Sequence, residues 1–227
     1  FEVPKPTGGE ALRRKSERSP ELALESARQA MVLLKNNGIL PLDPGAGMKV
    51  AVIGPNSDVC RLGSRSGTPE KTVSLLEGIR ELSRGRFEVS HAKGCIMALN
   101  DTNDSYLNWR HVNEVNFATL PENRPLIEEA ISVARDSDIV ILALGESELM
   151  RRETLGANHL GDRASLRLTE SQEELARQIG LLEKPVILFL FHGGPMVLGE
   201  LEAAFDAIVT GHYNGQETGT AAAELLF

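Results

Sequence analysis

Apolar residues recur along this chain in two alternating patterns. Between residues 20 and 36 they fall at helical spacing, which predicts one helix that begins at Ser19-Pro20 and ends before Gly38. Farther along, short runs rich in apolar and β-branched residues alternate with amphipathic segments. The strands that these runs predict are residues 49–54, 87–91, 138–144, 185–191 and 206–210. The predicted helices are residues 71–84, 124–135, 169–182, 195–203 and 215–227.

Strands that are apolar on both faces and alternate with helices are typical of a mainly parallel β-sheet that is covered by helices on both faces. The pattern therefore predicts the α/β class, built as a three-layer α/β sandwich. Residues 1–19 are rich in Pro, Gly, Lys and Arg and lack periodicity, so they are expected to form a linker or arm. Residues 20–227 are expected to form the sandwich domain. Thr169 precedes Gln172 by three positions, which predicts a capping box at the start of that helix.

Composition and net charge exclude some classes of function, but they say little more about the fold. The net charge is −8 at pH 7 and the pI is near 5.2. A negative surface disfavours binding to nucleic acid or to an anionic membrane. No apolar run approaches the roughly 20 residues that a membrane span needs. The two cysteines, Cys60 and Cys95, can form no disulfide framework and lack the spacing of a zinc site, so both are expected to be plain thiols.

In a sheet of this type, ligands bind beyond the carboxyl ends of the strands, so the loops that follow the strands are the candidates for a site. Residues 54–58 (GPNSD) and 192–195 (HGGP) are two such loops that contain glycine. Neither carries the Gly-x-Gly-x-x-Gly pattern or a Walker lysine. Both are interpreted as sharp turns in preference to phosphate sites.

The stretch 145–163 is the longest polar loop that directly follows a predicted strand. It is dense in ionisable side chains: Glu146, Glu148, Glu153, His159, Asp162 and Arg163. Each one alone is more often a solvated charge, but together at the end of a buried strand they predict a site. A carboxylic acid near apolar walls can keep its proton at neutral pH and donate it to a leaving group. No Gly-x-Ser-x-Gly motif is present and His159 and Asp162 have no second ligand cluster, so neither a serine triad nor a metal site is expected.

Several segments, in order along the chain, resemble the carboxyl-terminal α/β-sandwich domain of glycoside hydrolase family 3, the family of β-glucosidases and β-xylosidases. These segments are residues 27–42 (ARQAMVLLKNNGILPL), 49–56 (KVAVIGPN), 62–64 (LGS), 158–163 (NHLGDR) and 215–217 (GQE). The resemblance runs from about residue 27 to residue 227. It implies a hydrolase that needs no cofactor and acts on a β-linked oligosaccharide or glycoside.

The resemblance also implies context outside this sequence. Members of this type carry an amino-terminal (β/α)8-like barrel with the nucleophilic Asp, so that barrel is the expected partner of this domain, and the last strand or strands of the sandwich are expected to be absent here. The chain alone is therefore expected to be inactive. A periplasmic or secreted location is favoured over a cytoplasmic one, although no segment of this sequence decides it.

The family's acid/base maps onto the loop 145–163. In members with a Gly-Glu followed by a Met-containing loop, it lies seven residues after that first Glu, which is Glu153 here, with Glu146 as the fallback. The resemblance then implies a retaining mechanism in which Glu153 protonates the glycosidic oxygen and later deprotonates water. The implied substrate-binding residues are Arg65, His159, Asp162 and Arg163. Arg65 stands where many relatives have a Trp in the sugar-facing wall, and residues 192–195 lack the Arg of the family's Asn-Gly-Arg-Pro turn.

Two rival interpretations stay open at this point. In the first, the domain is a non-catalytic scaffold or a glucan-binding domain of the same enzyme, and Glu153 is a solvated charge. In the second, the alternating α/β pattern belongs to a flavodoxin-like nucleotide binder, which the absence of a phosphate motif disfavours. The sequence does not distinguish a glucoside from a xyloside substrate.

Overall fold

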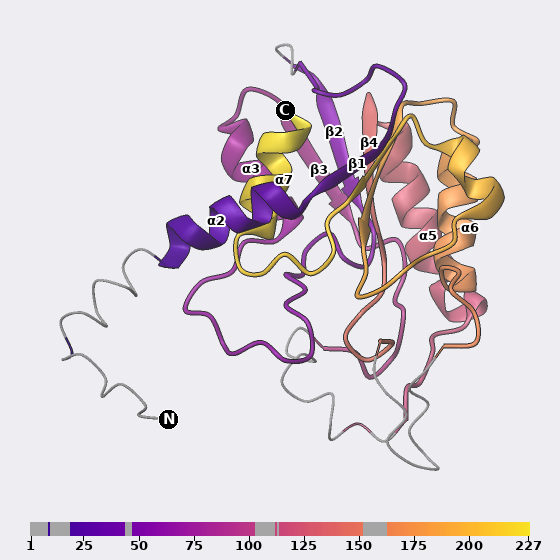
Figure 1. Cartoon of the computed structure of the whole chain (residues 1–227). Coiled ribbons are helices and arrows are strands. Elements are labelled where there is room, and N and C mark those ends of the chain that lie inside the picture. Colours follow the sequence, from indigo (N-terminus) through magenta and orange to yellow (C-terminus); the bar gives the residue numbers. More distant parts are fainter. Residues whose placement is uncertain (1–8, 10–18, 44–46, 103–111, 113, 152–162) are drawn as a thin grey trace.

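The computed structural model describes residues 9, 19–43, 47–102, 112, 114–151 and 163–227. Its centre is a six-stranded sheet with the order β1-β6-β5-β4-β2-β3 (Figure 1). The edge strand β1 runs antiparallel to β6, and every other neighbouring pair is parallel. The strands are β1 (Val32–Asn36), β2 (Lys49–Ile53), β3 (Glu88–Ala92), β4 (Ile139–Gly145), β5 (Val186–Phe191) and β6 (Ala207–Thr210). The predicted α/β class with a mainly parallel sheet is confirmed.

Helices cover both faces of the sheet, as predicted. The helices are α2 (Ser19–Ala30), α3 (Leu75–Ser83), α5 (Leu120–Arg135), α6 (Glu170–Gly180), α7 (Thr218–Leu226) and the 3-10 helix η1 (Gly199–Ala204). Figure 1 shows α2, α3 and α7 on one side and α5 and α6 on the other. Successive strand residues point to opposite faces, so in β4 Ile141 packs in the α2/α3/α7 core and Leu142 packs in the α5/α6/η1 core. Burial on both faces explains why the central strands are apolar at every position.

The prediction of one helix over residues 20–36 is wrong in its second half, where the chain forms strand β1. Residue pairing with β6, from Val32 opposite Thr210 to Asn36 opposite Ala207, supplies a ladder that the helical spacing of the local sequence could not reveal. The turn that follows is held by Asn36, whose side-chain oxygen accepts hydrogen bonds from the N–H groups of residues 38–40. The helix predicted over residues 195–203 is also corrected, to the 3-10 helix η1.

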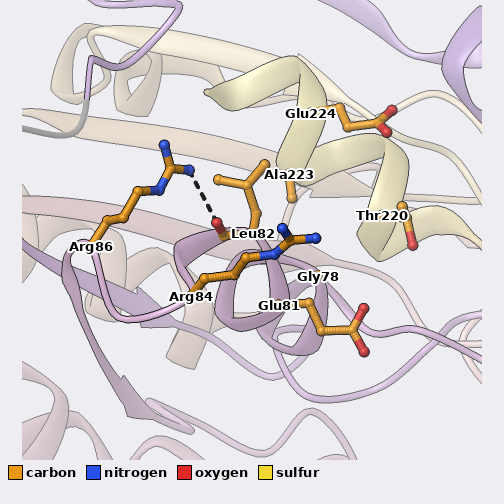
Figure 2. Close-up of a pocket in the computed structure, with 8 residues that line it drawn as sticks. All are labelled: Gly78, Glu81, Leu82, Arg84, Arg86, Thr220, Ala223 and Glu224. Carbon is orange, nitrogen blue, oxygen red and sulfur yellow. Dashed lines mark hydrogen bonds between the residues drawn. The ribbon is translucent and has the colours of Figure 1, made fainter.

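Helices α3 and α7 pack so closely that their backbones touch. A Cβ atom on Gly78 would lie 2.0 Å from the carbonyl oxygen of Gly219, so only glycine permits this contact. Beside the contact lies a cavity of about 600 Å³, shown in Figure 2. Its charged and polar lining comes from Glu81, Arg84, Arg86, Thr220 and Glu224. Because α3 ends just before β3 begins, this cavity lies toward the amino-terminal edge of the parallel strands, away from the loops that follow β4.

The strand order creates one place where the chain reverses its direction of winding. From β2 the chain passes to α3 on one face of the sheet, whereas from β4 it passes to α6 on the opposite face. Strands β2 and β4 are neighbours, so their carboxyl ends flank a topological switch point, where open α/β sheets usually bind ligands. Within the described ranges, no helix is long and apolar enough to cross a membrane.

Candidate functional site

The predicted site residues divide into two groups. Glu153, His159 and Asp162 lie outside the described residues. Glu146 and Arg163 are described, and the structure brings them together in one ion pair. Arg65 lies on an exposed turn of the loop that follows β2 and belongs to the same edge of the sheet.

The segment that carries Glu146 is fixed at its root by Gly145, the last residue of β4. Gly145 has a φ of +132°, and a Cβ atom there would lie 1.7 Å from the carbonyl oxygen of Phe191. The side chain of Gln172 both accepts from the Gly145 N–H (2.7 Å) and donates to its carbonyl oxygen (2.9 Å). The next residue continues this fixed path, because the Glu146 N–H donates to the Phe191 carbonyl oxygen at 2.8 Å.

Gln172 was expected to complete a capping box with Thr169, and this prediction is wrong. Thr169 makes no side-chain hydrogen bond to the helix backbone. Gln172 instead donates to the Thr169 hydroxyl at 3.2 Å and spends its remaining hydrogen-bonding capacity on Gly145, in the adjacent strand. A Ser/Thr-x-x-Gln pattern has the same spacing in both arrangements, so the sequence held no signal that separates them.

The carboxylate of Glu146 is fully buried and both of its oxygens accept from arginines. Arg163 donates to Oε1 at 2.5 Å, and Arg151 donates to Oε2 at 3.1 Å. The backbone N–H of Gly193 also donates to Oε2, at 3.2 Å. Three donors therefore converge on this one buried carboxyl group, and two of them are guanidinium groups. The fallback role of Glu146 as acid/base stays a prediction.

The two arginines of this cluster are themselves held in place. Arg163 donates to the carbonyl oxygen of Arg167 at 2.6 Å. Arg151 donates to the carbonyl oxygen of Pro195 at 3.4 Å, and its side chain lies across the glycines of the 192–195 turn. A Cβ atom on Gly194 would lie 2.6 Å from an Arg151 guanidinium nitrogen. The glycines of this turn thus make room for a guanidinium from the neighbouring loop.

A second buried carboxylate, Glu148, joins the loop after β4 to the loop after β2. Arg61 donates to its Oε2 at 3.1 Å, and the N–H groups of Leu62 and Gly63 donate to its Oε1 at 3.0 and 3.2 Å. Arg61 also donates to Asp101 at 3.0 Å. Burial alone would lower the pKa of the Arg61 guanidinium, but the carboxylates of Asp101 and Glu148 raise it above its ordinary value. Arg61 follows β2 and Glu148 follows β4, so this cluster joins the two loops that flank the switch point.

Tyr213 lies between the two carboxylate clusters. A Cβ atom on Gly63 or on Gly193 would lie 3.4 Å or 3.0 Å from its ring, so the ring is packed between two loops. No described residue forms a hydrogen bond with its buried hydroxyl. Burial raises the pKa of the Tyr213 phenol, and the charge of Glu148 raises it further, so the ring is a neutral spacer between charged groups.

Burial shifts the pKa of two further groups at this edge in the direction that favours the neutral form. Burial lowers the pKa of His192, and His212, whose ring centroid lies 4.4 Å away, lowers it further. His192 pairs with the hydroxyl of Thr210 through Nε2. Cys60 is a free thiol whose pKa burial raises to about 12.

Over the described ranges of the chain, no group of three or more His, Cys, Asp or Glu side chains could hold a metal ion.

The order of these elements along the chain corresponds to a known domain. The model of the glycosyl hydrolase family 3 C-terminal domain matches residues 31–227. The chain belongs to this family. The resemblance inferred from the LLKN, IGPN and GQE segments is therefore confirmed.

Relatives of this family 3 domain are named as β-xylosidases and β-glucosidases. A β-xylosidase of Formosa agariphila is 32% identical over 233 residues, which cover 99% of this chain and 28% of the relative. The periplasmic β-glucosidase of Salmonella typhimurium is 32% identical over 212 residues, which cover 90% of this chain and 26% of the relative. The solved structure of a β-glucosidase from Erythrobacter marinus aligns with a TM-score of 0.83 and 35% identity over 92% of this chain and 28% of that one. The family 3 domain described here thus spans about a quarter of the length of these relatives.

Proposed function

We propose that this domain supplies the general acid/base, Glu153, of a retaining, exo-acting β-glycosidase. The observation that carries the proposal is the anchoring of Arg151, two residues before Glu153, at the carboxyl edge of β4. Arg163, after the same segment, is anchored on the same carboxylate. A proton donor needs a fixed approach to the bond it acts on, and these two ion pairs fix the chain on both sides of Glu153.

In this proposal the nucleophilic Asp comes from an amino-terminal (β/α)8 barrel that lies outside the sequence. The nucleophile attacks the anomeric carbon while Glu153 protonates the glycosidic oxygen, and Glu153 then takes a proton from the incoming water. The two carboxyl groups would lie roughly 5–5.5 Å apart in the assembled enzyme. Terminal β-linked glucose is the first candidate substrate and β-linked xylose the second, which agrees with the names of the relatives.

The four substrate-binding residues expected from the sequence have different roles in the proposal. Arg65 is exposed at the same edge of the sheet and is suited to a sugar-facing wall. His159 and Asp162 remain candidates on the same loop as Glu153. Arg163 is committed to Glu146 and to the carbonyl oxygen of Arg167, so it is proposed to position the loop instead of contacting sugar.

The test compares the whole polypeptide that carries this domain with its Glu153→Gln variant. Aryl β-glucosides and β-xylosides with good and poor leaving groups are assayed with and without azide. We expect a loss of about 10²–10⁴-fold for poor leaving groups, a much smaller loss for activated ones, and glycosyl azide as a product. The isolated 227-residue chain serves as a control and is expected to show no turnover. An unchanged rate in the variant would contradict the proposal and leave the domain a scaffold or glucan-binding unit.

A further inference from the structure

We propose that Glu146 is a positioning residue whose carboxylate ties together the two ends of the segment that carries Glu153. The inference rests on the proposed function, and it gives this buried anion a task that the acid/base chemistry does not use. The geometry that points to it is the convergence of Arg151 and Arg163 on one carboxylate.

The two arginines flank Glu153 in the sequence. Arg151 lies two residues before it and Arg163 lies ten residues after it. They bind different oxygens of Glu146, so residues on either side of Glu153 are held at one carboxylate. Without a shared anion, two guanidinium groups this close would repel each other.

Glu146 is itself held in place by the central strands. Its backbone N–H donates a hydrogen bond to the Phe191 carbonyl oxygen in β5, and Gly145 before it is hydrogen-bonded to the side chain of Gln172. The Gly193 N–H adds a third donor to the carboxylate from the loop after β5. Glu146 thus fixes the positions of the two arginines relative to the central strands β4 and β5, which are fully buried.

The two arms of the clamp differ in exposure to water. The Arg163 side chain is 16% exposed, whereas the Arg151 side chain is 28% exposed. An ion pair shielded from water is screened less. Loss of the Arg163 arm should therefore disturb Glu153 more than loss of the Arg151 arm.

A purely structural carboxylate and a positioning carboxylate predict different kinetics. Loss of stability alone lowers the amount of active enzyme and reduces turnover of all substrates equally. Misplacement of the acid instead reduces turnover of substrates that need a proton, because a shift of about 1 Å can cost about 10²-fold in rate. The ratio of the rates for poor and good leaving groups separates the two.

The experiment uses the whole polypeptide with Glu146→Gln, Arg163→Gln, Arg151→Gln and, alongside, Glu153→Gln. Asp206→Asn is the matched control, since Asp206 also accepts a backbone N–H (that of Val186, 2.9 Å) but at the opposite edge of the sheet. We expect Glu146→Gln to lose about 10²-fold on poor leaving groups and far less on activated ones. Arg163→Gln should lose less than Glu146→Gln and more than Arg151→Gln, and Asp206→Asn should keep the wild-type ratio.

Hydrogen exchange on the same proteins reports the clamp without reference to catalysis. Peptides covering residues 147–151 and 163–167 should exchange faster in Glu146→Gln, while peptides from β2 should not change. Should Glu146→Gln fail to fold, Arg163→Gln carries both readouts. An equal loss on all substrates, or unchanged exchange in those peptides, would overturn the inference. An unchanged rate in Glu153→Gln would instead overturn the proposed function. The hydrogen-exchange result would still decide whether Glu146 holds the loop.

Discussion

Glu146 and Glu148 are two residues apart and almost equally buried, yet they bind arginines from different parts of the sequence. Glu146 takes its arginines from its own loop, five and seventeen residues farther along the chain. Glu148 takes Arg61 from a loop 87 residues away. The first carboxylate holds two arginines of its own loop and one N–H of the loop after β5, whereas the second joins its loop to the loop after β2. Two carboxylates with almost the same burial can therefore differ in what they do, because their arginine partners come from different parts of the sequence.

The Glu148 cluster and the Glu146 cluster also differ in how far their side chains are exposed to water. Arg61 is 5% exposed and Asp101 is 8% exposed, whereas the arginines of Glu146 are 16% and 28% exposed. Charges that are withdrawn from water depend more strongly on their partners. We therefore expect the Glu148 cluster to govern stability and the Glu146 cluster to govern geometry at the site, and the predictions below are ordered by the size of the effect.

The largest expected effect comes from Arg61→Met. The change leaves Glu148 and Asp101 buried without their shared cation, so it should lower the free energy of unfolding by about 3–5 kcal/mol. Arg151→Met should lower it by only about 1 kcal/mol, because water reaches that side chain. Urea unfolding of both variants measures the two values. Equal losses would remove the distinction between the clusters.

A smaller effect is expected at the root of Glu146. Gly145→Ala puts a side chain on a residue with φ of +132° and against the Phe191 carbonyl oxygen, so we expect a loss of about 3 kcal/mol. Gly215→Ala is the control, since Gly215 also has positive φ (+80°) but has nothing within 4 Å of the added atom. Its loss should be about 1 kcal/mol. Thermal unfolding of the two variants gives the difference, and equal midpoints would mean that the close contact at Gly145 contributes nothing.

The smallest effect is the pH dependence of stability that comes from His192, a residue close to Glu146. Burial lowers the pKa of His192 below its ordinary value of 6.5, so the unfolded chain binds a proton near pH 6.5 that the folded chain does not. Stability is therefore complete above pH 6.5 and falls as the pH drops from 6.5 toward the lowered native value. His192→Asn should reduce this slope, which for one group is at most about 1.4 kcal/mol per pH unit.

Urea unfolding between pH 7.5 and 5.5 measures that slope. Burial also lowers the pKa of His91, in β3, so part of the slope should persist in His192→Asn. His91→Asn is the companion variant and should remove the remaining part. A slope that neither variant changes would show that other groups set the pH dependence.

Much of the sheet could be predicted because buried parallel strands leave a simple trace in sequence. Runs such as residues 139–144 and 185–191 are apolar throughout, and no surface helix has that pattern. Strand β1 left no such trace. Val32, Leu33 and Leu34 are 46–60% exposed, and their strand conformation depends on pairing with β6, more than 170 residues away. Local spacing alone favoured a helix there.

Part of the charged cluster could be predicted. The density of charge after β4 predicted that ionisable side chains gather there, and Glu146 and Arg163 do meet, while the role of Glu153 stays a prediction. The sequence did not reveal Arg61 or Gln172. A single arginine in a polar loop looks like a solvated charge, and a glutamine three residues after a threonine looks like a helix cap. Both act through contacts with distant strands, which only the fold brings close.

The Arg61 guanidinium at the switch point has a consequence for how this domain can recognise anything. Beyond the carboxyl ends of β2 and β4, where other doubly wound sheets hold a nucleotide or another small molecule, this chain places its own Arg61, which donates hydrogen bonds to Glu148 and Asp101. Under the proposed function, the outer loops and the surface that they face would then decide which sugar is bound, so that selectivity could change over evolution without any change to the sheet.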